Sequence, residues 1–135
     1  MKNSFTRRAL AGCAAATVTA LALSVPGSAH HSTAMFAWGE STSMDSMTVV
    51  RWEWTNPHTF LYASDADGKR YAFEGMSPNH LVRYGWSRRS LRPGQEVDLT
   101  YYPLRDGRPG GFNVTVTLPD GKTLNQFGEG GSQTN

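Results

Sequence analysis

Hydrophobic and polar residues alternate along most of the chain after residue 46, as they do in β-strands that bury one face. The alternation runs through residues 47–54, 58–64, 70–74, 95–102, 112–118 and 122–127. It is most regular in the fifth of these segments, where Phe112, Val114, Val116 and Leu118 fall on one predicted face. Turns containing glycine, such as residues 65–68 and 120–121, separate neighbouring segments. The pattern therefore predicts a series of short antiparallel strands.

One segment departs from this alternation and predicts a short helix over residues 78–84. Ser77 is a typical N-cap residue, Pro78 suits the first helical position, and Gly85 suits the position after the helix ends. Leu81 and Tyr84 would face inward. The order is then three strands, one helix and two or three further strands, which is typical of an OB-type barrel. We expect an all-β fold with one short helix, as a small antiparallel OB-like barrel; an SH3-like barrel and a small sandwich are the alternatives.

The first 29 residues have the three parts of a secretory signal peptide. They begin with basic residues, continue with an apolar run over residues 9–25 and end in Gly27-Ser28-Ala29, which suits signal peptidase. The run is too short and too rich in Ala and Thr for a membrane span, and no second run follows, so we expect no span. Arg7-Arg8 leaves both Sec and twin-arginine export open. These features predict an exported protein of the periplasm.

Cleavage after the leader would leave 106 of the 135 residues. We expect residues 30–46 to form an extended N-terminal arm, residues 47–127 the barrel, and residues 128–135 a disordered tail. The full chain carries a net charge of +2, but three of its 13 Lys and Arg residues lie in the leader, which leaves ten against 11 Asp and Glu. A nearly neutral mature protein has no electrostatic reason to bind nucleic acid. The only cysteine, Cys13, is also in the leader, so thiol catalysis and cysteine metal sites are excluded from the mature chain.

Two adjacent histidines, His30 and His31, directly follow the predicted cleavage position. Cleavage after Ala29 would give His30 a free α-amine, which together with its imidazole chelates copper(II). Cleavage one residue earlier would place His31 third, where the amine, two backbone amides and the imidazole form a square-planar set. Both positions supply nitrogen ligands, so the prediction of a copper site holds in either case.

The other histidines are weaker candidates as metal ligands. His58 follows a predicted turn at a strand start, where it either reaches the arm from the barrel rim as a ligand or forms a structural hydrogen bond. His80 falls in the first helical turn and is expected to face solvent. The leading hypothesis is a periplasmic copper-binding or copper-delivery module that uses His30, His31 and His58.

The alternative hypothesis is a non-enzymatic interaction module of the cell envelope that binds no metal. It would bind a partner protein or a small ligand, possible surface residues being Trp52, Trp54, Trp86 and Tyr102. The chain has no nucleophile elbow, no glycine-rich phosphate loop and no clearly paired carboxylates. We therefore expect no enzymatic activity under either hypothesis.

Several short motifs together resemble a family of secreted bacterial proteins catalogued only as a domain of unknown function. Such proteins share an Ala-His-His-Ser start and a Trp-x-Asn-Pro-His motif, found here at residues 29–32 and 54–58. The resemblance continues through Met35-Phe36, Ser77-Pro78, Gly85-Trp86, Pro93-Gly94 and residues 103–107. Ala37 and Met47 depart from it, because similar proteins often have Asp and Gly there. The resemblance implies secretion and a small domain, but it brings no established activity.

Overall fold

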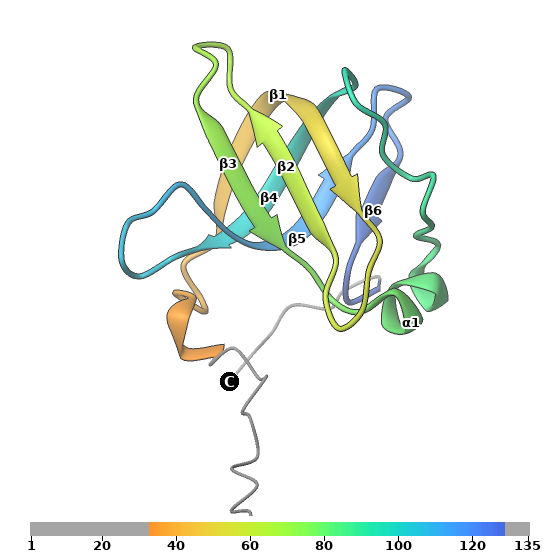
Figure 1. Ribbon diagram of the computed structural model, residues 1–135, viewed down its shortest axis with the longest axis horizontal. Coiled ribbons are helices and arrows are strands. Elements are labelled where there is room, and N and C mark those ends of the chain that lie inside the picture. Colours follow the sequence, from red (N-terminus) through yellow and green to blue (C-terminus); the bar gives the residue numbers. More distant parts are fainter. Residues whose placement is uncertain (1–32, 129–135) are drawn as a thin grey trace, which may run out of the picture.

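The computed structural model describes residues 33–128, which form a small closed β-barrel (Figure 1). The six strands are β1 (Thr42–Glu53), β2 (Phe60–Ser64), β3 (Arg70–Glu74), β4 (Glu96–Pro103), β5 (Gly110–Thr117) and β6 (Thr123–Asn125). They follow one another around the sheet in the order β3-β2-β1-β4-β5-β6, and a pairing between β3 and β5 closes the barrel. The predicted small barrel is confirmed. The closing pair is parallel, so the barrel is mixed rather than wholly antiparallel as predicted.

The closing pair depends on two glycines at the start of β5. Ala72 pairs with Gly110 and Phe73 with Gly111. A Cβ atom at Gly110 would overlap the carbonyl oxygen of Ala72, and one at Gly111 would overlap the carbonyl oxygen of Tyr102. Only glycine allows the backbones to approach this closely, so these two positions make the closure possible.

The barrel interior holds the main hydrophobic core. Inward residues of all six strands meet there with Leu81, Trp86 and Leu91 from the connection between β3 and β4. The largest fully buried side chains in this core include Phe73, Met47, Leu61 and Leu99. These side chains come from alternate strand positions, which is why the alternation predicted the strands so well.

β1 begins at Thr42, earlier than the predicted barrel boundary at residue 47. Its first part pairs with β4 and its second part with β2, and each pairing contains a register shift. At the first shift Ser46 has a φ of 52°, and its N–H donates to Oδ1 of Asp98 at 2.9 Å. Irregular pairing of this kind obscures the alternation in sequence. Residues 42–46 therefore belong to β1 and not to the extended arm predicted over residues 30–46.

A second register shift divides the regular-looking segment of β5. Thr100 pairs with Thr115, but Tyr101 pairs with Asn113, so Val114 is the extra residue. As a result, Val116 joins the interior core, whereas Phe112 and Val114 belong to a separate cluster. The single face predicted for Phe112, Val114, Val116 and Leu118 was therefore wrong.

The residues before β1 cover this separate cluster on the outside of β4 and β5. We call it the outer aromatic cluster; its buried members are Phe36, Tyr102, Phe112 and Val114, with Trp38 and Phe127 among the half-buried ones. The ring of Phe36 lies 5.4 Å from Trp38 and 5.5 Å from Phe112, both edge to face. Backbone hydrogen bonds hold the same segment, since Ala37 N–H donates to Pro103 O at 2.8 Å and Arg105 N–H donates to Met35 O at 2.9 Å.

The connection from β3 to β4 contains α1 (Pro78–Leu81) and the 3-10 turn η2 (Val82–Tyr84). The predicted start is confirmed, because Oγ of Ser77 accepts a hydrogen bond from the backbone N–H of His80 at 3.3 Å. Leu81 is buried as predicted, but Tyr84 is exposed, because the helix tightens into the 3-10 form after Leu81. Among residues 33–128 the fold has no helix long and apolar enough to span a membrane.

Candidate functional site

His58 and Glu74 form a pair where β3 ends and the loop before β2 returns to the sheet. Nδ1 of His58 lies 3.1 Å from Oε1 of Glu74 and 3.0 Å from the carbonyl oxygen of Gly75. A carbonyl oxygen can only accept, so Nδ1 carries the proton and donates it. The Glu74 side chain is 10% exposed and the His58 side chain 32%. The imidazole is therefore held at one nitrogen, and its Nε2 has no hydrogen-bond partner among the described residues.

A buried polar layer below this pair fixes its backbone. Thr59 is fully buried, its hydroxyl donates to Met76 O at 2.9 Å, and Gly75 N–H donates to Thr59 O at 2.8 Å. Oε1 of Gln126 accepts from Met76 N–H at 2.6 Å. A Cβ atom at Gly75 would lie 2.5 Å from Oγ1 of Thr59 and 2.7 Å from Nε2 of Gln126. Gly75, whose carbonyl oxygen accepts from His58, therefore has no room for a side chain beside Thr59 and Gln126.

Two side-chain amide groups in this region have buried atoms without a hydrogen-bond partner among the described residues. Both side-chain polar atoms of Asn113, and Nε2 of Gln126, are buried and have no hydrogen-bond partner within residues 33–128. Asn113 faces the interior because the register shift at Val114 turns it away from the outer aromatic cluster. Polar groups therefore replace apolar ones at this end of the barrel.

The site lies next to the outer aromatic cluster. Glu74 pairs with Phe112 across the parallel closure, and the ring of Phe112 lies 5.2 Å from that of Trp38. Nε1 of Trp38 donates to the carbonyl oxygen of Thr33 at 2.6 Å, which fixes the first described residues against the barrel. The segment that follows the predicted histidine pair is thus anchored over β5, at the strand position that pairs with Glu74.

The other predicted ligands are placed differently. His30 and His31, together with the predicted leader and most of the predicted tail, lie outside the described residues. His80, which was predicted to face solvent, is instead half-buried in α1, where its Nε2 donates to Gln126 O at 2.7 Å and has a structural role. The part of the chain that the structure describes has no group of three or more His, Cys, Asp or Glu side chains that could hold a metal by themselves.

The four aromatic residues predicted as a possible interaction surface do not lie together on the surface. Trp86 is 2% exposed and Tyr102 4% exposed; the first belongs to the interior core and the second to the outer aromatic cluster. Trp52 and Trp54 are half-buried, with ring centroids 5.7 Å apart, and Trp52 lies 5.7 Å from Trp86. Only the two half-buried tryptophans remain available to a partner.

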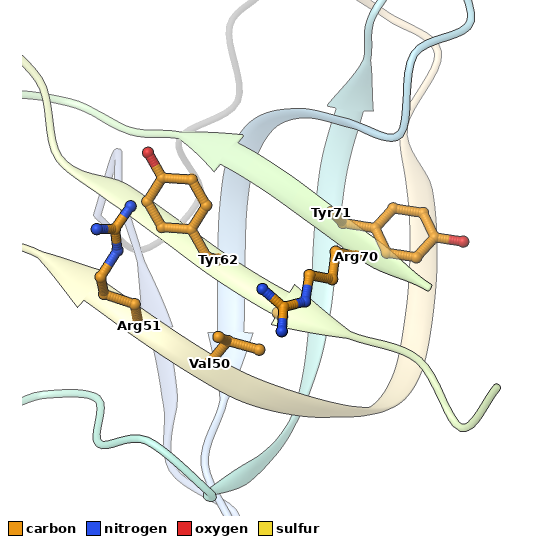
Figure 2. A pocket seen from close by; sticks show the side chains of 6 residues that line it. Val50, Arg51, Tyr62, Arg70 and Tyr71 are labelled. Carbon is orange, nitrogen blue, oxygen red and sulfur yellow. The ribbon is translucent and has the colours of Figure 1, made fainter. Parts of the chain in front are cut away.

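A surface that the sequence analysis missed lies on the outside of β1, β2 and β3. It contains a pocket of about 380 Å³, lined by Val50, Arg51, Tyr62, Ala63, Arg70 and Tyr71 (Figure 2). The alternation predicts Arg51 on the polar face of its strand but Tyr62, with Phe60, on the apolar face of the next. In the structure Leu61 and Ala63 fill the core, and Tyr62 faces outward beside Arg51. We refer to this surface as the β1–β3 pocket.

Two ionisable groups outside these sites, Tyr101 and Asp106, have pKa values that their surroundings shift. Burial, and secondarily the nearby Tyr71, raises the pKa of Tyr101 above its ordinary value of 10.0. Hydrogen bonds from the backbone and side chain of Arg108 lower the pKa of Asp106. Asp106 and Arg108 form an exposed ion pair in the loop before β5, with Nε and Oδ2 2.7 Å apart. Neither group adds to the chemistry around His58.

Comparison with known protein families identifies the family of this chain. The family of unknown function DUF6152 matches residues 18–113, which is more than half of the sequence. The matched segment contains His30, His31, His58 and Glu74. No curated protein and no solved structure matches the chain. The protein belongs to this family of unknown function.

Proposed function

We propose that this member of a family of unknown function is a periplasmic, non-enzymatic module that binds or delivers copper. The ligands would be the α-amine and imidazoles of the mature N-terminus, from His30 and His31, together with Nε2 of His58. One observation supports the proposal most strongly: Nδ1–H of His58 is held by Glu74 and Gly75 O, while Nε2 has no partner among the described residues.

This arrangement is typical of a histidine that binds metal. Ligating histidines usually donate their second ring N–H to a carboxylate or a backbone carbonyl, which fixes the tautomer and makes the free nitrogen a better ligand. His58 has both kinds of acceptor within 3.1 Å. In contrast, Nε2 of His80 is occupied by Gln126 O, so the two described histidines are not equivalent.

Copper suits the proposed ligand set better than other common metals. Among divalent first-row metals, copper(II) is the one that imidazole and amine nitrogens bind most tightly. The mature chain has no thiolate to favour zinc. Nε2 of His58 alone does not make a metal site, so the N-terminal nitrogens are essential to the proposal. The anchoring of Thr33 by Trp38 supports a site shared between the N-terminus and the barrel.

The test uses untagged protein recovered from the periplasm, since a tag would block the α-amine. Intact mass identifies the first residue, and copper(II) titration followed by electron paramagnetic resonance reports stoichiometry and nitrogen ligands. We expect a tight one-to-one complex. We also expect the His58→Ala variant to bind copper about tenfold or more weakly, as for loss of a ligand or of its supporting residue.

His80→Ala is the matched control, because it removes an imidazole whose nitrogen is already occupied, and we expect it to bind copper as the parent does. Glu74→Gln should weaken binding less than His58→Ala, because Gly75 O still orients the ring. A one-to-one complex unaffected by His58→Ala would confine the site to the N-terminus and contradict the shared site. Absence of any tight complex would overturn the proposal and favour the interaction module instead.

A further inference from the structure

We propose that the connection between α1 and β4 binds the surface of an anionic phospholipid membrane. Arginines without a charge partner and exposed apolar side chains occur together in this connection. We call this the basic surface; its members are Val82, Arg83, Tyr84, Arg88, Arg89 and Arg92. The inference goes beyond the copper proposal and shares with it only the predicted export, which would place the protein beside membranes.

The positive charge of the basic surface is not neutralised within the described chain. No acidic residue lies between Glu74 and Glu96, whereas four arginines do. All four are exposed, and within residues 33–128 none of their guanidinium groups forms an ion pair or a hydrogen bond. In contrast, Arg51 and Arg108 each have a carboxylate partner, at 3.0 Å and 2.7 Å. The basic surface is therefore free to attract an anionic partner.

The exposed apolar residues are the second observation. Within residues 33–128, Val82 and Tyr84 are the only large hydrophobic residues that are exposed, at 57% and 38%. Both belong to η2, on either side of Arg83. A single exposed apolar side chain is ordinary, but here both occur in the connection that contains the unpaired arginines. Basic and apolar side chains on one surface are typical of segments that lie in a membrane interface.

The backbone of the basic surface is fixed by contacts with the barrel. Trp86 is 2% exposed, and its Nε1 donates to Asn125 O at 3.0 Å. After it, Ser87 N–H donates to Oγ of Ser90 at 2.8 Å, and Arg89 N–H donates to Oγ of Ser87 at 3.2 Å. Figure 1 shows this connection running along one outer side of the barrel from α1 to β4. Binding would therefore need to order side chains only, which lowers its entropic cost.

A bilayer satisfies both kinds of side chain at once. Arg89 and Arg92 line an open hollow of about 490 Å³ together with polar groups such as Gln95, and a guanidinium donates two parallel N–H groups to a phosphate. A nucleic acid or a free phosphate would leave Val82 and Tyr84 in water. In a bilayer, apolar side chains enter about 5–10 Å into the boundary between headgroups and acyl chains, while basic ones stay beside the phosphates.

The experiment is cosedimentation of the full mature protein with lipid vesicles in a chelating buffer, so that its outcome is independent of copper. One set of vesicles is phosphatidylcholine alone, and the other contains equal parts of phosphatidylcholine and phosphatidylglycerol. We expect binding to the anionic vesicles only. Raising the salt from about 0.1 M to about 1 M should release the protein, because the Debye length falls from about 10 Å to about 3 Å.

Variants test whether the basic surface makes the contact. Replacing Arg88 and Arg89 together, as Arg88→Gln and Arg89→Gln, should lower the partition coefficient about 25-fold, since each arginine near an anionic surface contributes about fivefold. The matched control is Arg51→Gln with Arg70→Gln, which changes the net charge equally on the outside of β1–β3. It should stay within about twofold of the parent, because salt screens charges distant from the membrane. Val82→Ser should weaken binding without changing its salt dependence.

Thermal denaturation checks that each variant is folded before its binding is compared. The proposal is overturned if the protein does not sediment with the anionic vesicles, in which case an acidic protein is the partner left for this charge. It is also overturned if both kinds of vesicle bind equally well, or if the two double variants lose affinity equally.

Discussion

The two outer faces of the barrel differ in what covers them. On the outside of β4 and β5, residues before β1 bury the outer aromatic cluster with Phe36 and Trp38. On the outside of β1, β2 and β3, no segment of residues 33–128 covers Arg51, Tyr62 or Arg70, and a pocket remains. The covered face contributes to stability and anchors the chain that leads to the proposed copper ligands. The uncovered face is the one available to a ligand from solution.

The largest expected effect comes from breaking the closure that joins the two faces. Gly110→Ala would place a methyl group against the carbonyl oxygen of Ala72, so β3 and β5 must separate. We expect a loss of more than about 4 kcal/mol in the free energy of unfolding, within the exceptional range for single substitutions. Urea denaturation followed by circular dichroism measures it.

Gly107→Ala is the matched control for this prediction. Gly107 also has a positive φ, 77°, but a Cβ atom there would meet nothing within 4 Å. We expect its cost to be only about 1–2 kcal/mol, from the left-handed backbone alone. Equal losses in the two variants would show that the overlap with Ala72 does not matter.

A second prediction compares the two faces directly through one phenylalanine on each. Phe36 is 4% exposed in the outer aromatic cluster, so Phe36→Ala should cost about 3–5 kcal/mol. Phe60 is half-buried on the other face, where it stacks on Tyr62 with ring centroids 6.2 Å apart. Phe60→Ala should cost only about 1 kcal/mol, since less apolar surface is lost. Thermal denaturation of both variants tests this; a smaller loss for Phe36→Ala would contradict the comparison.

The third and smallest effect concerns the interior that separates the faces. Burial raises the pKa of Tyr101, so above pH 10 the unfolded chain releases a proton that the folded protein retains. The free energy of unfolding should therefore fall as the pH rises above 10. In Tyr101→Phe this contribution is absent, and the decline between pH 9 and pH 11 should be shallower. Parallel declines in the two proteins, measured by urea denaturation at each pH, would exclude the effect.

Much of the fold was predictable because local patterns specify it. The hairpin between β2 and β3, the N-cap at Ser77 and the place of the helix between the third and fourth strands all follow from turn residues and alternation. Register shifts were not predictable, because an extra residue such as Val114 keeps the alternation in sequence while reversing the faces in space.

The candidate site was predictable only in part. His58 was recognised as either a ligand or a structural residue, and the choice depends on Glu74, which lies 16 positions away and gives no sequence signal of its own. Trp86 and Tyr102 were expected at the surface under the hypothesis of an interaction module. Their burial depends on segments far away in the sequence. Trp38 packs on Tyr102 with ring centroids 5.1 Å apart, and Trp86 packs on Trp52 and donates from Nε1 to Asn125 O at 3.0 Å. The arginines beside Tyr62 were missed because pairing across strands is a property of register.

The tight fit of Gly75 against Thr59 and Gln126 has a consequence for the evolution of this family. A side chain at position 75 cannot be accommodated while both neighbours keep their present size. Substitutions at these three positions should therefore be inherited together: a relative with alanine at 75 is expected to carry a smaller residue at 59 or 126. Joint variation at positions 59, 75 and 126 would therefore show whether relatives maintain the backbone that orients His58.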